Sequence, residues 1–196
     1  MRAERVDLMK SDLRPSGAEY TSLGHSMFGG EEFSMKWGRD DHGRILLPTY
    51  RHCFVCGSGN PIGLGLQFAV RDGRVETSFV PRKEHCGYRG VVHGGVLASV
   101  LDECMGWTII TRRKVMCISA EITLRFKRPA PPERPLLVSA ECVDYRSRLM
   151  SAQGEITDEE GHTICTGQGK FVPLSDEEME IVRSYADWGR ALDEVY

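Results

Sequence analysis

The chain has 196 residues, of which 41% are hydrophobic and 27% are charged, a composition typical of a soluble globular protein with a sizeable core. Its formal net charge of −3 and pI of about 6.1 exclude the strongly basic surface typical of nucleic-acid binding. No stretch approaches the roughly 18 consecutive apolar residues of a membrane helix, and the N-terminus lacks the apolar core of a signal peptide. We therefore expect a cytoplasmic protein with neither nucleic-acid nor membrane partners.

Residues 1–50 form an N-terminal extension in which the sequence pattern is weakest. Residues 1–13 are charged with a weak apolar period, which Pro15-Ser16-Gly17 interrupts. Residues 33–37 and 44–47 flank the turn-like segment 40–43, so a hairpin is predicted there. The extension carries no recognisable chemistry. We expect it to be an arm that packs on the main domain or on a second subunit.

A Cys-x-x-Cys spacing at Cys53 and Cys56 is the next feature along the chain. A structural zinc site usually takes four ligands from two such pairs, and the sequence has no second pair. His52, His85 and Cys86 complete a set only if the fold brings them together. The seven cysteines are scattered and odd in number, which favours reduced thiols. Two packed thiols are the preferred interpretation, ahead of a zinc site and a redox pair, and no metal is expected.

A β-hairpin and a long helix are predicted next. Apolar residues alternate with smaller or polar ones from Leu64 to Val70 and from Val75 to Phe79, and Asp72-Gly73 marks a tight turn between them. Residues 81–90 then form a loop that leads into an apolar run with helical spacing. This helix is expected to end around Ile110-Thr111.

Two stripes of the predicted helix differ in character. A core stripe consists of Leu97, Val100, Leu101, Cys104 and Trp107. The adjoining stripe has small residues around one carboxylate, and it consists of Gly95, Ala98, Ser99, Asp102 and Gly106. Desolvation of Asp102 would raise its pKa, and the amides near Gly94 and Gly95 lack helical partners and can stabilise an oxyanion. The helix thus offers a base and oxyanion donors, or alternatively only a Gly-Gly hinge and a capping or paired aspartate.

Beyond the helix, alternating apolar and polar residues predict strands over 118–127, 136–144, 149–157 and 162–172. Ser175-Asp176-Glu177-Glu178 is a capping box, so a C-terminal helix is expected from 176 to about 192. Two strands, one long helix and four further strands predict an α+β fold. In it, a single helix covers one face of an antiparallel sheet of about six strands.

These features resemble the hotdog-fold thioesterase superfamily, and within it the branch related to the phenylacetate-pathway (PaaI-like) thioesterase. The resemblance covers roughly residues 53–173. It is carried by His93-Gly94-Gly95 with Asp102 nine positions after the histidine, by Cys53-Phe54-Val55-Cys56-Gly57 with Asn60-Pro61-Ile62-Gly63-Leu64, and by Leu101-Asp102-Glu103-Cys104-Met105-Gly106-Trp107. It implies a hotdog domain at 51–174 between the extension and a C-terminal helix at 175–196. It also implies a homodimer with a continuous sheet, or a homotetramer built from two such dimers.

The resemblance gives the helix residues catalytic roles. Asp102 would act as nucleophile or as general base toward water, and the Gly94 amide, with Gly95 beside it, would hold the thioester carbonyl. His93 would orient the substrate or the loop. Ser119 would assist from the partner subunit, so that the active sites lie at the subunit interface.

One position departs from the pattern of these relatives. Some relatives carry an Asn six residues before the motif histidine to position the water, and this chain has Gly87 there, with His85 and Cys86 nearby as substitutes. Basic side chains at the mouth would bind the phosphates of coenzyme A. The candidates for these are Arg89, Arg125, Lys127 and Arg128.

The predicted function is an acyl-CoA thioesterase, which hydrolyses a thioester to a carboxylic acid and CoA. Coenzyme A enters as part of the substrate, and no other cofactor is expected. The alternative is a non-catalytic protein that binds acyl-CoA or another acyl ligand, which Gly87 in place of Asn favours. A hotdog hydratase or dehydratase and a zinc-stapled interaction protein rank below these two.

Overall fold

A computed structural model of the protein describes residues 6–14, 17–26, 44–146 and 148–178. The chain divides into two compact units, Met1–Phe33 and Ser34–Tyr196. The first unit contains an antiparallel hairpin of β1 (Val6–Arg14) and β2 (Gly17–Ser26). The weak apolar period of this segment did not predict these strands. The expected packing of the extension on the main domain or on a second subunit stays a prediction.

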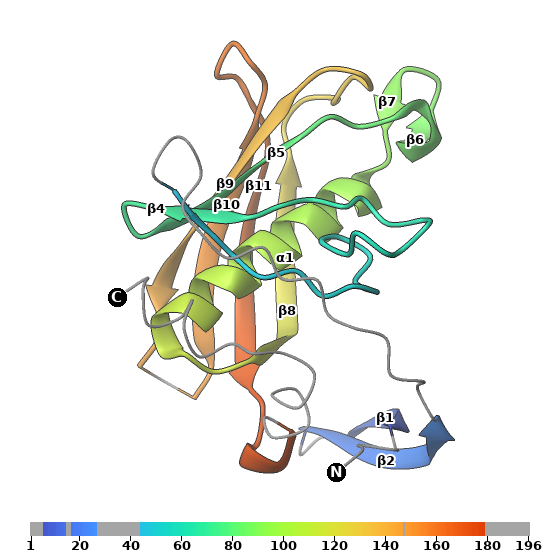
Figure 1. The fold of residues 1–196 in the computed structure, drawn as a ribbon, viewed down its shortest axis with the longest axis vertical. Helices are drawn as coiled ribbons and strands as arrows, with labels where there is room; N and C mark the ends of the chain where they lie inside the picture. Colours follow the sequence, from blue (N-terminus) through green and yellow to red (C-terminus); the bar gives the residue numbers. More distant parts are fainter. Residues whose placement is uncertain (1–5, 15–16, 27–43, 147, 179–196) are drawn as a thin grey trace. The chain divides into compact units, whose positions relative to one another are not determined.

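A seven-stranded antiparallel sheet forms the framework of the second unit (Figure 1). From one edge to the other, its strands are β3 (Ile45–Leu46), β4 (Ala69–Arg71), β5 (Arg74–Phe79), β9 (Leu136–Asp144), β10 (Met150–Thr157), β11 (Thr163–Pro173) and β8 (Cys117–Phe126). The four strands that follow the helix lie within one residue of their predicted bounds. Strand β8 is at the edge of the sheet, with β11 as its neighbour within the chain.

The strand predicted from Leu64 to Val70 differs from the observed one in its length and in its hydrogen-bond partner. Leu64 and Leu66 donate backbone hydrogen bonds to the carbonyls of Phe54 and Val55, at 2.8 and 2.9 Å, so this segment joins the Cys53–Cys56 loop and only its end forms β4. Strand β3 pairs with β4 and brings the sheet to seven strands. The predicted partner of residues 44–47, at 33–37, lies outside the described residues.

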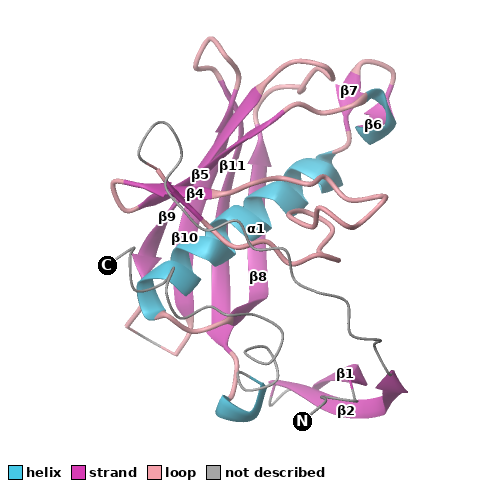
Figure 2. Cartoon of the chain, viewed as in Figure 1, coloured by secondary structure: helices cyan, strands magenta, loops and turns pink. Residues whose placement is uncertain are grey.

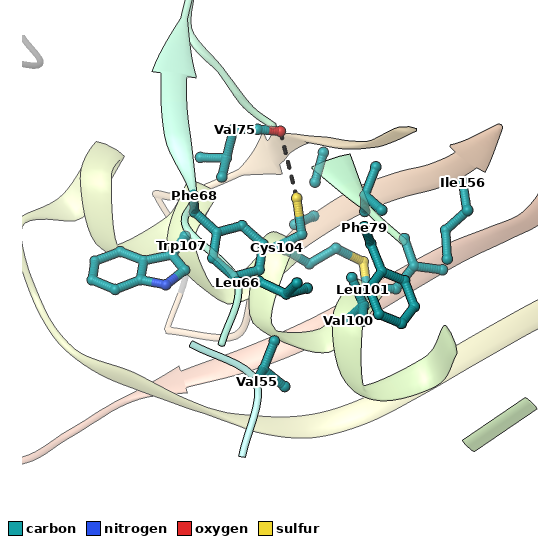
Figure 3. Packing of buried hydrophobic residues seen from close by; sticks show 14 of the residues in the cluster. Val55, Leu66, Phe68, Val75, Phe79, Val100, Leu101, Cys104, Trp107 and Ile156 are labelled. Atoms are coloured by element: carbon teal, nitrogen blue, oxygen red, sulfur yellow. Dashed lines mark hydrogen bonds between the residues drawn. The ribbon is translucent and has the colours of Figure 1, made fainter. Parts of the chain in front are cut away.

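Helix α1 (Gly94–Arg113) lies across one face of the sheet (Figures 1 and 2) and packs on β5, β8, β9, β10 and β11. It ends where Lys114 takes a left-handed conformation, with φ of 56°. The predicted core stripe is buried, as the close packing around Leu101 and Cys104 in Figure 3 illustrates. The small-residue stripe is only partly buried or exposed, so it faces away from the core.

A short hairpin precedes the helix where the sequence predicted a loop. Strands β6 (Cys86–Tyr88) and β7 (Val91–Val92) pair antiparallel, and Gly90 has a positive φ of 77° in the turn between them. The backbone N–H of His93 donates to the carbonyl of His85 at 2.8 Å, and that of Val92 donates to Ala130 at 2.9 Å. These bonds fix the start of α1 against the residue just before the hairpin and against the segment that follows β8.

The C-terminal capping box is present as predicted. The Ser175 N–H donates to Glu178 Oε2 at 2.8 Å, and the Glu178 N–H donates to Ser175 Oγ at 3.3 Å. Residues 176–178 are helical, and the rest of the predicted helix lies outside the described residues. Among the helices in the described part of the chain, none has the length and apolar character needed to cross a bilayer.

Candidate active site

Asp102 and Ser119 form the polar centre of the surface shared by α1 and β8. Ser119 Oγ donates a hydrogen bond of 2.5 Å to Asp102 Oδ1. Burial raises the pKa of Asp102 above its ordinary value, and the bond from Ser119 acts in the opposite direction. A partly desolvated carboxylate with a raised pKa is suited to accept a proton from water. The bond forms within one chain, whereas the family resemblance implied assistance by Ser119 from the partner subunit.

The start of α1 presents one available amide rather than two. His93 Nδ1 accepts a hydrogen bond of 2.8 Å from the Gly95 N–H, so this amide becomes available only when the ring turns away. The Gly94 N–H has no acceptor among the described residues. Of the two predicted oxyanion donors, Gly94 is therefore the one that is free to bind a carbonyl oxygen.

A cavity of about 440 Å³ opens beside this free amide. Its lining includes His93 and Gly94 from the helix start, and Phe126, Lys127 and Arg128 from the end of β8. The cavity thus combines an amide donor, an apolar wall and two exposed basic side chains. These are the groups that a thioester carbonyl, an acyl or pantetheine chain and phosphates require.

The other residues that were predicted to bind the substrate lie in different parts of the structure. Gly87 lines the same cavity, whereas Arg89 is exposed and outside its lining. Arg125 lines a separate hollow of about 410 Å³ together with Arg74 and Glu141. The ring of His85 is occupied elsewhere, because its Nδ1 accepts the N–H of Arg82 at 3.0 Å. The structure therefore places Gly87, Lys127 and Arg128 in the lining of the cavity at the helix start, and the side chains of His85, Arg89 and Arg125 are not part of that lining.

Gly87 is in close contact with the motif histidine. A Cβ atom at position 87 would lie 2.9 Å from His93 Cδ2, which is closer than real Cβ contacts allow. An asparagine here would displace the ring that caps the helix. The glycine is therefore matched to the observed position of His93.

Glu103, which follows Asp102, was not singled out from the sequence. Cys53 Sγ donates to Glu103 Oε1 at 3.7 Å, and Trp107 Nε1 donates to the same oxygen at 3.2 Å. The Cys56 thiol and backbone N–H groups lower the pKa of Cys53 to about 6, and burial raises the pKa of Glu103 to about 7. The Trp107 contact follows the i,i+4 spacing of a helix, which was the one signal in the sequence for this side chain.

Comparison with known proteins shows what part of this chain is similar to. A model of the thioesterase superfamily matches residues 89–165, the segment from the turn before α1 to β11. Over these residues the chain is similar to the thioesterase superfamily. The arrangement of one long helix on an antiparallel sheet is the hotdog fold, as predicted. A search of curated proteins returned no match.

Several solved structures share this fold. A thioesterase superfamily protein is 26% identical with a TM-score of 0.59, and the match covers 64% of this chain and 62% of that protein. A hypothetical thioesterase from Streptococcus pneumoniae TIGR4, solved with coenzyme A, is 21% identical over 54% of this chain and 82% of its own, with a TM-score of 0.51. The E. coli PaaI protein of the phenylacetic acid degradation operon is 18% identical over 57% and 81%, with a TM-score of 0.53. This chain spans less than two thirds of the first protein's length, and the other two likenesses show the hotdog fold alone.

Proposed function

We propose that the protein is an acyl-CoA thioesterase with Asp102 as its base or nucleophile. The observation that carries this proposal is the partly buried Asp102, held by Ser119 on the small-residue face of a hotdog helix. In the general-base form of the reaction, Asp102 accepts a proton from water while the oxygen attacks the thioester carbonyl carbon. The carbonyl oxygen becomes an oxyanion held by the Gly94 N–H. Collapse breaks the C–S bond, and the CoA thiolate takes the proton from Asp102.

This proposal requires two chains. Asp102 is eight positions after Gly94, and a helix rises 1.5 Å per residue, so the two groups lie about 12 Å apart along the axis. A reacting carbonyl must lie within about 3 Å of each. The Gly94 amide of one chain therefore works with Asp102 of another, and the active site is an interface site.

The open edge of the sheet supports the same arrangement. Ser119 is near one end of β8 and Phe126 is at the other, beside Gly94, where an added Cβ atom would lie 3.2 Å from the Phe126 ring. Two-fold antiparallel pairing of β8 with a second copy would put the Ser119 end of each strand beside the Phe126 end of the other. Ile118 and Phe126 on this strand are 48% and 54% exposed, which suits burial in such an interface. We propose a homodimer formed through β8, with doubling to a homotetramer as the further step.

Lys127 and Arg128 are the groups we assign to the CoA phosphates, because both line the cavity at Gly94. Two solved structures of this fold, from Streptococcus pneumoniae and Streptococcus mutans, contain coenzyme A and acetyl-CoA respectively. A PaaI-like substrate range and a cytoplasmic location belong to this proposal as predictions.

A non-catalytic acyl-CoA binding protein is the second candidate. It is favoured by Gly87, where some relatives have an asparagine for the water, and by the capped Gly95 amide. The two candidates separate in one experiment, in which wild-type protein is incubated with short-chain, medium-chain and aromatic CoA esters while thiol release and ligand-induced thermal shift are measured. We expect catalytic thiol release from at least one ester class. A thermal shift without thiol release from any ester would favour the binding protein.

A further inference from the structure

A further polar cluster lies where the loop around Cys53 meets α1 at Glu103, the residue after Asp102. It consists of Cys53, Cys56 and Glu103, whose sulfur and carboxylate atoms all lie within 4.8 Å of one another. The proposed thioesterase reaction uses none of these three side chains. His52, His85 and Cys86, the partners that the sequence offered for the cysteine pair, do not join this cluster.

The loop around the two cysteines directs backbone donors at both sulfurs. Cys53 Sγ accepts the N–H groups of Val55 and Cys56 at 3.3 and 3.4 Å, and Cys56 Sγ accepts the N–H of Tyr50 at 3.5 Å. N–H groups directed at sulfur stabilise the thiolate, which is the form that binds metals. Gly57 completes the turn, because a Cβ atom there would lie 2.4 Å from the Cys53 carbonyl oxygen. The backbone is thus shaped to hold both sulfurs in place.

Glu103 provides a third donor from a different element. Its Oε1 lies 3.7 Å from Cys53 Sγ and accepts the Trp107 Nε1–H at 3.2 Å, which fixes the carboxylate. No Lys, Arg or His in the described ranges forms an ion pair with Glu103. The loop and the helix thus place three potential metal ligands, two sulfurs and one carboxylate oxygen, beside one another.

The distance between a sulfur and the carboxylate oxygen of this cluster fits a tetrahedral zinc site. With zinc–sulfur and zinc–oxygen bonds of about 2.3 and 2.0 Å, two ligands of a tetrahedral site lie about 3.5 Å apart. The observed sulfur–oxygen distance of 3.7 Å is close to this value. Two thiolates exclude Mg²⁺ and Ca²⁺ as preferred ions, and three protein ligands leave one tetrahedral position for water.

We propose that Cys53, Cys56 and Glu103 bind one Zn²⁺ ion per chain, which ties the loop at residues 50–57 to helix α1. Val55 from this loop and Trp107 from the helix lie in the same core (Figure 3), so the ion reinforces packing that already brings the two elements together. Its bonds would hold the helix at the residue that follows Asp102. This inference is independent of the proposed reaction, because it requires no turnover.

The test uses the full chain, stripped of metal under reducing conditions and titrated with zinc chloride alone. Elemental analysis after gel filtration should give one zinc per chain for the wild type, and the melting temperature should rise by several degrees on addition of zinc. Zinc should also slow the alkylation of Cys53 and Cys56, read by peptide mass spectrometry, and leave that of Cys86 unchanged. Since metal content and alkylation are measured without substrate, an inactive thioesterase would not affect the result.

Matched variants make the assignment specific. Glu103→Gln keeps both thiols and nearly the same volume, and it should lower the zinc content or weaken binding at least tenfold. Cys53→Ser should abolish binding, whereas the control Cys86→Ser should retain it. The proposal would be overturned if the wild-type protein bound no zinc. It would also be overturned if the protein carried a Cys53–Cys56 disulfide after purification without reductant and took up no zinc after reduction. Stoichiometric binding that survives in Cys53→Ser would overturn it as well.

Discussion

An active site shared by two chains should allow two inactive variants to regain activity when they are combined in one heterodimer. Gly94→Pro removes the free N–H at the first helical position, where proline is well tolerated. His93 already has the extended backbone that must precede a proline, with φ of −62° and ψ of 132°. Loss of one oxyanion donor costs about 10²- to 10³-fold in kcat. Gly94→Ala is the matched control, because it adds the same Cβ atom beside Phe126 and keeps the N–H.

The restoration follows from the separation of about 12 Å between the two groups within a chain. A heterodimer of one Gly94→Pro chain and one Asp102→Asn chain contains one site with both defects and one site with neither. Two differently tagged chains can be co-expressed and purified over both tags, and thiol release is then measured per dimer. We expect about half of the wild-type activity from this symmetry. Activity no greater than that of the two parent homodimers would refute the shared site and would require Gly94 and Asp102 to act within one chain.

Three further outcomes follow from the same structure. The kcat/KM of the wild type should fall on acidification below a pKa that lies above that of an ordinary aspartate, because burial raises the pKa of Asp102. Ser119→Ala should move this acid limb to higher pH, because the hydrogen bond from Ser119 lowers the pKa of Asp102 and the variant removes it. The pH–rate profiles of both proteins measure these shifts. Replacing Lys127 and Arg128 together with alanine should raise KM for a CoA ester about tenfold and leave KM for a thioester without phosphates nearly unchanged, as steady-state kinetics on the two substrates would reveal. Leu101→Ala should lower the free energy of unfolding by about 2–5 kcal/mol in urea denaturation, because the side chain is fully buried between helix and sheet.

Much of the fold could be predicted because its strands alternate apolar and polar residues and one helix has a clear core stripe. The alternation reflects burial, which the structure reproduces in β5, β9, β10 and β11, whereas Ile118 and Phe126 of the edge strand β8 are about half exposed. The prediction was wrong where hydrogen-bond partners decide the outcome. Leu64 and Leu66 have a strand pattern, yet their N–H groups bond to the Cys53–Cys56 loop and so lie outside the sheet.

The site could be predicted only in part, because it too depends on hydrogen-bond partners. Sequence spacing placed Asp102 and the Gly94 amide on one helix, but it carries no information on the side chains that compete for these groups. His93 occupies the Gly95 amide through its own ring, and the geometry of a cap depends on a rotamer. Glu103 was missed because its partner Cys53 is 50 residues away in the chain and joins it only through the fold.

The most direct test of the thioesterase account is the rate of CoA release by Asp102→Asn beside wild type and the surface control Glu159→Gln, with binding of the CoA ester measured in parallel. Loss of the base should lower kcat by about 10²- to 10⁴-fold, while ester binding and the melting temperature stay close to those of the wild type. Glu159→Gln should behave as wild type, because Glu159 is exposed in the turn between β10 and β11. An Asp102→Asn variant that binds the ester and releases CoA at the wild-type rate would contradict the account.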